Sequence, residues 1–346
     1  MKLVVLGGGG YLGARAVKAL QGLPGVEVKV AGRSARGPDG VQVDLTRPET
    51  FGALDGVDLV LDVADATRAP PDALARHCLE RGVTFVEASS DRAVVERLHD
   101  TLKDVPSPKG AVVLGAGIFT GLSNLLAAEA ARRAGNARRV VWAARTTPFA
   151  GAGESTVKLM TDTLRVPTVR YEAGQRVTGP TVLRGPALPF PSGVFPTLES
   201  AMAEGPMLHH SLGVDTRVYL SPYPRVLQTM FLAMPAWLLG SGVFLWFLGV
   251  YFSLLRRVLL AGRPSDTELV ARAEGDRVVT LGLRVDDGMR AGGEALAALG
   301  LLLAEHPPRG RAVYFIDQCV TLDEAVARMH ALPGAPSKVT VKELEA

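Results

Sequence analysis

Short apolar runs alternate with helix-like stretches through the first third of the chain. The runs are rich in valine and leucine and occupy residues 2–6, 26–31, 58–63, 84–87 and 111–114. Runs of this length that are bounded by turn residues are typical of strands buried in a sheet. Between them, residues 14–20 and 70–81 have the pattern of helices. Strands that alternate with helices predict a doubly wound parallel sheet of the α/β class.

The first run ends in a glycine cluster. Gly8, Gly10 and Gly13 satisfy the spacing G-x-G-x-x-G, and Gly7, Gly10 and Gly13 satisfy G-x-x-G-x-x-G. Missing side chains let the backbone turn tightly, let its amides approach a phosphate and let the helix pack on the strand, while the helix N-terminus adds partial positive charge. The pattern therefore predicts a dinucleotide site, although a glycine-rich turn without a ligand has the same spacing. The expected site residues are Gly7, Gly8, Gly10, Tyr11, Leu12 and Gly13.

The residues after the second strand bear on which dinucleotide is bound. Enzymes that use NAD place an acidic residue there to hold the ribose hydroxyls, whereas this chain has Arg33 and Ser34. A guanidinium can pair with the 2′-phosphate of NADP, and an acid would repel it. We therefore expect NADP rather than NAD, with Arg33 and Ser34 in the site. The alternative is that Arg33 is a solvated loop charge and that Asp44, after the next strand, meets the adenine edge or nothing.

Composition excludes several other classes of function. The 346 residues include 38 Lys and Arg against 35 Asp and Glu, with no long basic run, so nucleic-acid binding is not expected. Cys78 and Cys319 stand far apart without a C-x-x-C motif, which fits a reducing cytoplasm and predicts neither a disulfide framework nor a metal site. The few apolar residues before the glycines are too short a run for a signal-peptide core.

A second glycine-rich passage follows the sixth strand. Residues 115–126 read GAGIFTGLSNLL, again a strand, a glycine turn and a helix. Because it follows the last strand of the predicted sheet, we expect Gly117 to shape the floor of a nicotinamide pocket rather than to bind a second nucleotide.

These features together resemble the saccharopine dehydrogenase-like family, and in particular its bacterial NAD(P)-binding members of mostly unassigned substrate. The residues that carry the resemblance are GGGGYLG at 7–13, Ala31–Ser34, Phe85–Glu87, GAGIFTGLSNLLA at 115–127, Gly151–Thr156 and Pro189–Gly193. One departure is the strand end Glu87-Ala88-Ser89-Ser90, where many relatives carry an Asp. The resemblance implies a Rossmann domain over 1–135, an inserted α+β substrate or dimerisation domain over 136–288, and a C-terminal segment, 289–346, that returns to the Rossmann domain. It also implies reduction of imine, amino-acid or lipid-linked substrates.

The expected second domain contains a less regular pattern. Strands are predicted at 140–145, 168–171 and 217–220 and in a hairpin of 269–274 with 277–284; helices are predicted at 154–160 and 290–305.

Residues 226–255 contain no charge and seven aromatic side chains. The length of this segment would allow a membrane span, but Pro235 and Gly240-Ser241-Gly242 break it into two pieces that are each too short to cross. Two core or subunit-interface helices, a dip into one leaflet, and a kinked span all remain open. Arg256 and Arg257 would meet anionic headgroups or cap the helix C-terminus.

Candidate catalytic residues are few. No tyrosine has a lysine four residues later, the pair with which short-chain dehydrogenases donate a proton. Arg145 at a strand end could clamp a carboxylate, Lys158 could meet substrate, and His209 or His210 could donate a proton from a loop-like stretch. Each of these four also has an ordinary structural or solvated interpretation, so the catalytic residues stay unknown.

The sequence therefore predicts an NADP-dependent oxidoreductase that transfers hydride to or from a small molecule, hydrophobic or lipid-linked, in an interdomain cleft. The alternatives are a saccharopine-type amino-acid or imine reductase, and a non-catalytic NADP-binding redox sensor or scaffold. We expect a cytoplasmic homodimer with peripheral contact to the inner face of the cell membrane through 226–255.

Overall fold

The computed structural model describes residues 1–346 except 35, 36, 38, 67, 68, 147–165, 182, 224, 235–237, 239, 240, 256–265, 335 and 346. The chain forms two compact units. The first unit contains residues 1–125 and 290–337, and the second contains residues 126–289 and 338–346.

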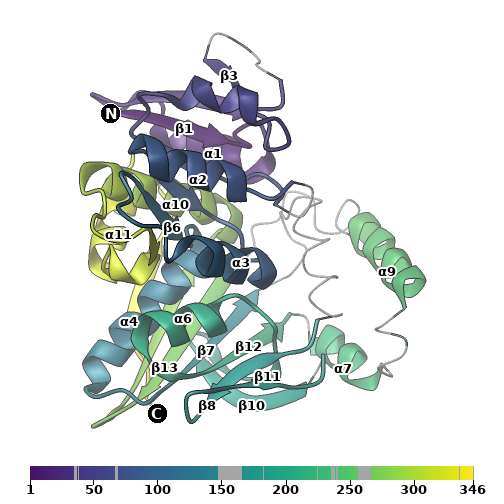
Figure 1. The fold of residues 1–346 in the computed structure, drawn as a ribbon. Helices are drawn as coiled ribbons and strands as arrows, with labels where there is room; N and C mark the ends of the chain where they lie inside the picture. Colours follow the sequence, from purple (N-terminus) through teal and green to yellow (C-terminus); the bar gives the residue numbers. More distant parts are fainter. Residues whose placement is uncertain are drawn as a thin grey trace. The chain divides into compact units, whose positions relative to one another are not determined.

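The first unit is built on a parallel sheet of seven strands (Figure 1). The strands lie in the order β15-β6-β5-β4-β1-β2-β3. Their bounds are Lys2–Leu6 for β1, Glu27–Gly32 for β2, Gly40–Gln42 for β3, Leu59–Asp62 for β4, Thr84–Glu87 for β5, Ala111–Leu114 for β6 and Val313–Phe315 for β15. The order reverses at β1, which lies between β2 and β4. Beyond the carboxyl ends of strands at such a reversal, open α/β sheets have the crevice in which they bind ligands. The predicted doubly wound sheet is confirmed.

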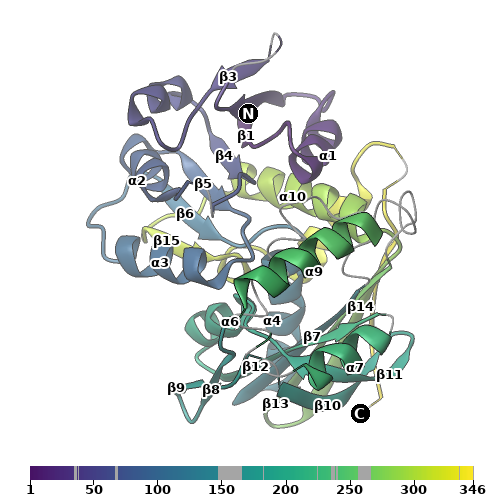
Figure 2. The same ribbon diagram turned by 90° about the vertical axis from the view of Figure 1, so that its right-hand side faces the viewer.

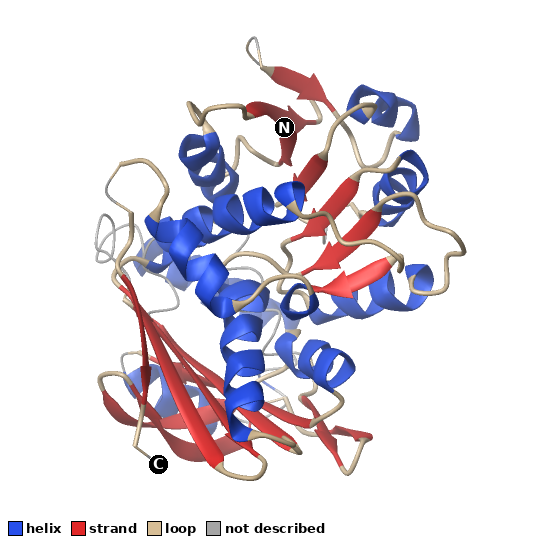
Figure 3. Ribbon diagram, turned by 90° about the vertical axis from the view of Figure 1, so that its left-hand side faces the viewer, coloured by secondary structure: helices blue, strands red, loops and turns tan. Residues whose placement is uncertain are grey.

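Helices lie on both faces of this sheet (Figure 3). They are α1 (Tyr11–Leu20), α2 (Asp72–Arg81), α3 (Arg92–Leu102), α10 (Gly288–Glu305) and α11 (Leu322–His330). In α1 the buried residues are Gly13, Ala16, Val17 and Leu20, spaced as one face of a helix. Helix α10 approaches α1 closely, since a Cβ atom at Gly293 would lie 2.4 Å from Arg15 Cβ.

The second unit contains a mixed sheet. Its main path is β10-β11-β12-β7-β13-β14-β16, with β8 on β12 and β9 on β8. The pair β12 and β7 is parallel and the other pairs are antiparallel. The bounds are β7 Arg139–Thr146, β8 Val169–Glu172, β9 Gln175–Thr178, β10 Leu183–Phe190, β11 Gly193–Glu199, β12 Asp215–Pro222, β13 Thr267–Glu274, β14 Val278–Val285 and β16 Val339–Glu343. The predicted hairpin is confirmed as β13 and β14, paired from Thr267 with Val285 to Glu274 with Val278.

The helices of this part of the chain are α4 (Ser123–Ala134), α6 (Glu204–Leu212), α7 (Arg225–Ala233) and α9 (Gly242–Leu255). A core cluster of Ala143, Leu188, Phe190, Tyr219 and Val270 packs around the central strands. Among the described residues of the uncharged segment, α7 and α9 are separate helices on either side of the sequence breaks (Figure 2). None of the described helices is both long and apolar enough to cross a membrane.

Two expectations are wrong. The stretch around His209 is the helix α6 rather than a loop, because Pro206 lies in its first turn, where a missing N–H breaks no intrahelical bond. Strand β16 was expected with the Rossmann domain, but it pairs with β14 in the second sheet. The domain ranges 1–135, 136–288 and 289–346 stay a prediction.

Candidate functional site

The glycine loop between β1 and α1 is held by its own backbone. Gly7 N donates to Ala31 O at 2.9 Å, Gly8 N to Val5 O at 3.1 Å and Gly10 N to Gly7 O at 2.8 Å. Gly7 has φ +81°, a conformation that favours glycine. A Cβ atom at Gly13 would lie 2.4 Å from Gly7 O, so glycine is needed there for the close approach of helix to loop. The loop is therefore a tight turn that brings the start of α1 to the carboxyl end of β1.

The start of α1 presents unpaired donors. Gly10 is the N-cap residue and has no side chain with which to cap the helix. The first helical bond runs from Ala14 N to Gly10 O at 2.9 Å, and the amides before it in a helix have no intrahelical acceptor. Tyr11 is exposed and its ring stacks under Arg15 at 3.7 Å, while Leu12 is half-buried. These amides and the helix dipole form the kind of site that binds a phosphate.

The residues expected to select the dinucleotide lie beyond β2. Arg33 and Ser34 directly follow this strand and are exposed, and Arg33 O accepts a hydrogen bond from Gln42 Nε2 at 3.1 Å. Asp44 accepts from the backbone N–H of Thr46 at 3.0 Å and from its hydroxyl at 2.8 Å, which lowers the pKa of Asp44. The Asp44 carboxylate is thus already engaged in its own turn, and Arg33 is an exposed charge directly after β2.

Two buried carboxyl groups, which the sequence analysis missed as site residues, end β4 and β5. Asp62 and Glu87 are paired in register, and each is 1% exposed. Asp62 Oδ1 accepts from Ala64 N and Glu87 Oε1 from Ser89 N, both at 2.9 Å. Their other oxygens are buried without a hydrogen-bond partner among the described residues.

Burial changes the protonation of this pair. It raises the pKa of Asp62 to about 7. Burial also raises the pKa of Glu87 well above its ordinary value, and the nearby charge of Asp62 adds to the effect. A carboxyl group that keeps its proton at neutral pH can donate a hydrogen bond. The signal in the sequence was an acid that ends an otherwise apolar run, at the edge of a parallel sheet where ligands bind.

The second glycine-rich passage also follows a strand of this sheet. Gly117 is buried with φ +90° and precedes a distorted turn over Ile118–Leu122. Within that turn the buried Thr120 has φ +58°, which is strained for a β-branched residue. The Thr120 hydroxyl donates to Phe119 O at 2.6 Å. Backbone strain of this kind clusters at functional sites, so Thr120 joins Gly117 as a candidate.

Arg145 lies in a preformed clamp in the second unit. Its guanidinium carbon lies 4.1 Å from the ring centre of Phe195 and 4.9 Å from that of Tyr223. Its Nη1 atom is 3.6 Å from a carboxylate oxygen of Glu268, which is 1% exposed. Ser192 donates to the same carboxylate at 2.7 Å. A substrate carboxylate would have to compete with Glu268 for Arg145.

The two candidate histidines lie at the end of α6. His209 is half-buried, stacks on Tyr171 with ring centres 3.8 Å apart, and its Nδ1 lies 2.8 Å from Val214 O. His210 is exposed, with its ring centre 5.5 Å from that of His209. These contacts favour a packing role for His209.

Lys158 lies outside the described residues. In the described part of the chain, no group of three or more His, Cys, Asp or Glu side chains could hold a metal ion.

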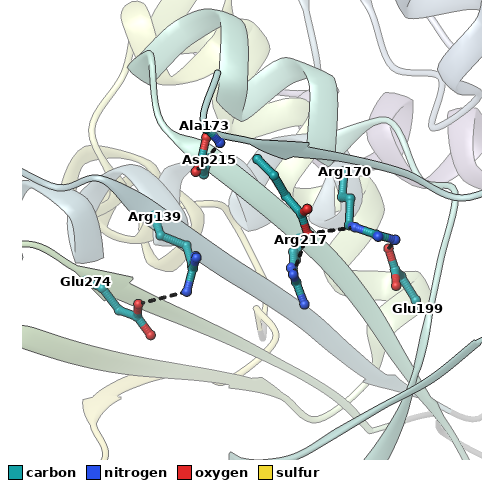
Figure 4. A network of polar contacts seen from close by, with 8 residues as sticks. Arg139, Arg170, Ala173, Glu199, Asp215, Arg217 and Glu274 are labelled. Atoms are coloured by element: carbon teal, nitrogen blue, oxygen red, sulfur yellow. Dashed lines mark hydrogen bonds and ion pairs between the residues drawn. The ribbon is translucent and has the colours of Figure 1, made fainter. Parts of the chain in front are cut away.

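A charge network runs across the second sheet (Figure 4). Each arginine drawn there faces a carboxylate. Arg139 pairs with Glu274 at 3.4 Å, Arg170 with Glu172 at 2.8 Å and with Glu199 at 3.5 Å, and Arg217 with Glu172. A hollow of about 280 Å³ is lined by Arg138, Arg139, Asp215 and Glu274. With two positive and two negative side chains around it, this hollow selects neither an anion nor a cation.

Comparison with known proteins places the fold. No protein-family model matches the chain, and no curated protein sequence matches it. The structure is similar to apo histidine-tagged saccharopine dehydrogenase (L-Glu forming) from Saccharomyces cerevisiae, with a TM-score of 0.63 and 11% identity over 99% of each chain. It is also similar to the C. glutamicum DAP dehydrogenase in complex with DAP, with a TM-score of 0.51 and 13% identity over 95% of this chain and 98% of that one.

The fold is saccharopine dehydrogenase-like. The resemblance read from the glycine motifs and strand ends is confirmed at the level of fold. Because one fold hosts many activities, the chemistry has to be argued from the residues of the site.

Proposed function

We propose that the protein is an NADP-dependent oxidoreductase, which transfers hydride between the nicotinamide and a small-molecule substrate. The observation that carries this proposal is the glycine loop at the reversal point of the parallel sheet. A Cβ atom at Gly10 would meet only Gly7 O, a tight contact at 3.1 Å, whereas one at Gly13 would lie 2.4 Å from the same atom, so packing demands glycine less at position 10 than at position 13. An open approach to the amides at the start of α1 is the reason to have glycine there.

The residues of the first unit fit an NADP cofactor. The amides at the start of α1, beside Gly8, Gly10 and Leu12, would hold the pyrophosphate. Arg33 would pair with the 2′-phosphate, with Ser34 beside it. When bound, the cofactor supplies the hydride chemistry, and the protein supplies position and electrostatics.

The second glycine-rich passage and the two buried acids follow or end strands of the same sheet, so they would lie near the bound cofactor at the carboxyl edge of that sheet. We assign Gly117 and Thr120 to the surroundings of the nicotinamide. Asp62 and Glu87 lie at the carboxyl ends of their strands, the edge on which a doubly negative pyrophosphate would lie. Their raised pKa values keep negative charge low at this edge, which reduces repulsion of the cofactor.

The second unit supports an apolar substrate over an amino acid. A saccharopine-type substrate would need basic groups that are ready to hold carboxylates, but Arg139, Arg145, Arg170 and Arg217 each pair with an acid of the chain. Releasing such an arginine for a substrate would cost the ion pair that it makes with an acid of the chain. An amino-acid or imine reductase is therefore the second candidate.

A non-catalytic NADP-binding sensor or scaffold is the third candidate. It is favoured by the engagement of Arg145 and His209 in packing contacts, which leaves the proton donor unassigned. A homodimer and a cytoplasmic location, the latter in keeping with the free Cys78 and Cys319, remain part of the proposal.

The test is cofactor binding followed by turnover. NADPH should bind to the purified protein and quench its tryptophan fluorescence, and NADH should bind more weakly. NADPH absorbance should then fall when a panel of apolar enones, imines and oxo acids is added. Failure to bind either cofactor would refute the dinucleotide site, and binding without turnover on any substrate would favour the sensor.

A further inference from the structure

Helix α9 exposes a continuous apolar face, which we call the α9 stripe. The stripe consists of Val243, Trp246, Phe247, Val250, Tyr251 and Leu254. Their spacing of three and four residues places them on one side of the helix. Their exposed fractions run from 48% at Val250 to 68% at Val243. Single exposed apolar residues are ordinary, but a full helix face of them marks an interaction surface.

The sequence of α9 is uncharged throughout. Leu248 is buried, and the sequence of the helix, GVFLWFLGVYFSLL, has no charged side chain. A surface helix of a soluble protein normally carries charged residues on its outward face. The outward face of α9 therefore suits an apolar environment rather than water.

The stretch of sequence that contains α9 has arginines but no acidic residue, although the first of them, Arg217, pairs with Glu172. Between Asp215 and Asp266 the chain has no acidic residue and no lysine, but it has five arginines, at 217, 225, 256, 257 and 263. Arg256 and Arg257 directly follow the last residue of α9 in the sequence. An uncharged helix next to arginines matches a surface that is apolar inside and anionic at its rim.

We propose that the α9 stripe docks on an anionic lipid bilayer and enters one leaflet. Trp246 and Tyr251 have the amphipathic rings that are enriched at the boundary between acyl chains and headgroups. The apolar residues of the stripe lie among the acyl chains, and the neighbouring arginines meet the headgroup phosphates. The protein is held at the membrane surface, where it can take an apolar substrate from the lipid.

The length of α9 decides whether it could cross a bilayer or only lie at its surface. Its 14 residues make a helix of about 21 Å, shorter than the roughly 30 Å of a bilayer core. Helix α7 ends at Ala233 and α9 begins at Gly242, so the two are separate helices. The stripe lies in the plane of the interface rather than across it.

A second copy of the chain is a poorer occupant. A two-fold dimer places the same patch of both subunits together, so this patch would meet a second stretch of chain that has arginines but no acidic residue between 216 and 265. Like charges in an interface oppose association, whereas an anionic lipid surface attracts them.

Vesicle sedimentation tests the proposal. The full-length protein is mixed with vesicles of phosphatidylglycerol and phosphatidylcholine, and with vesicles of phosphatidylcholine alone. We expect sedimentation with the anionic vesicles, at least roughly tenfold weaker binding to the neutral ones, and weakening by salt. The variant Trp246→Glu/Phe247→Lys leaves the net charge unchanged and should lose at least roughly tenfold in binding. Val194→Glu, at a residue 62% exposed on β11, is the control and should bind like the parent.

Two results would overturn the proposal. One is a parent protein that ignores anionic vesicles and is monomeric without detergent, because its own chain would then cover the stripe. The other is a parent oligomer that ignores vesicles and that the double variant converts to a monomer, because the occupant would then be a second copy. Circular dichroism and the NADPH titration show that each variant is folded.

Discussion

Replacing the glycines of the loop one at a time distinguishes those that the fold needs for packing from those that NADPH needs for its approach to the backbone amides. Gly9, Gly10 and Gly13 lie within five residues of one another, but a side chain at each meets a different environment. A Cβ atom at Gly9 has nothing within 4 Å, and one at Gly10 has only Gly7 O, at 3.1 Å. One at Gly13 would lie 2.4 Å from Gly7 O and 2.8 Å from Gly8 Cα, both backbone atoms.

The expected changes in stability and in NADPH affinity follow from these distances. Gly10 has φ −78° and ψ 174°, an extended conformation open to any residue, but a Cβ atom requires Gly7 O to shift by a few tenths of an ångström, so Gly10→Val should change stability by about 1 kcal/mol. Its side chain would stand where the pyrophosphate approaches. Loss of one charge-assisted hydrogen bond to phosphate is about 2 kcal/mol, or roughly thirtyfold in affinity, and the loss grows with each amide that is blocked. Gly13→Ala forces the helix off the loop and should cost about 1–3 kcal/mol or more in stability.

The assay combines thermal unfolding with NADPH titration on the parent and three variants. We expect Gly9→Val to resemble the parent in both measurements, Gly10→Val to unfold like the parent but to lose NADPH, and Gly13→Ala to unfold several degrees lower. A Gly10→Val protein that binds NADPH as tightly as the parent would refute the reasoning, because the loop would then be only a turn.

Other expected outcomes concern single side chains. Arg33→Ala should weaken NADPH binding about tenfold and NADH binding little in parallel fluorescence titrations, and equal losses would contradict a 2′-phosphate contact. Burial raises the pKa of Asp62 from 3.8 to about 7, so the folded state binds this proton more tightly than the unfolded state and the resulting stability is lost as pH rises from about 4 to about 7. Asp62→Asn should therefore be more stable than the parent at pH 8, by on the order of 2–4 kcal/mol in urea unfolding, and a parent and variant with the same pH profile would contradict the raised pKa. Arg145→Met removes one of the two arginines beside the buried Glu268, the other being Arg284 at 3.8 Å, and should destabilise the fold by about 1–3 kcal/mol, whereas unchanged unfolding with lost turnover would favour a carboxylate substrate.

The first sheet could be predicted well because its strands are buried on both faces. Such strands read as unbroken apolar runs, and the predicted bounds 84–87 and 111–114 are those of β5 and β6. Strands β10 and β11 could not be found in this way. Prolines at 186, 189 and 196 interrupt them, and a proline normally argues against a strand. β10 accommodates two of these prolines because it ends the sheet, where a missing N–H breaks fewer ladder bonds.

Some features of the candidate site could likewise be predicted from the sequence, and others could not. The glycine loop is local, so its spacing predicts its turn and its helix. The buried acids depend on register between strands that are distant in sequence, since Asp62 faces Glu87 only once β4 and β5 pair. The engagement of Arg145 likewise requires Glu268 from β13 and Phe195 from β11. No local pattern at Arg145 distinguishes this clamp from a free arginine.

The central claim is that the glycine loop of the first unit binds NADP, and a crystal structure of the protein soaked with NADPH tests it most directly. The account predicts density for the pyrophosphate against the amides at the start of α1 and for the 2′-phosphate beside Arg33. Density for the cofactor away from this loop, or none at a saturating concentration, would contradict it.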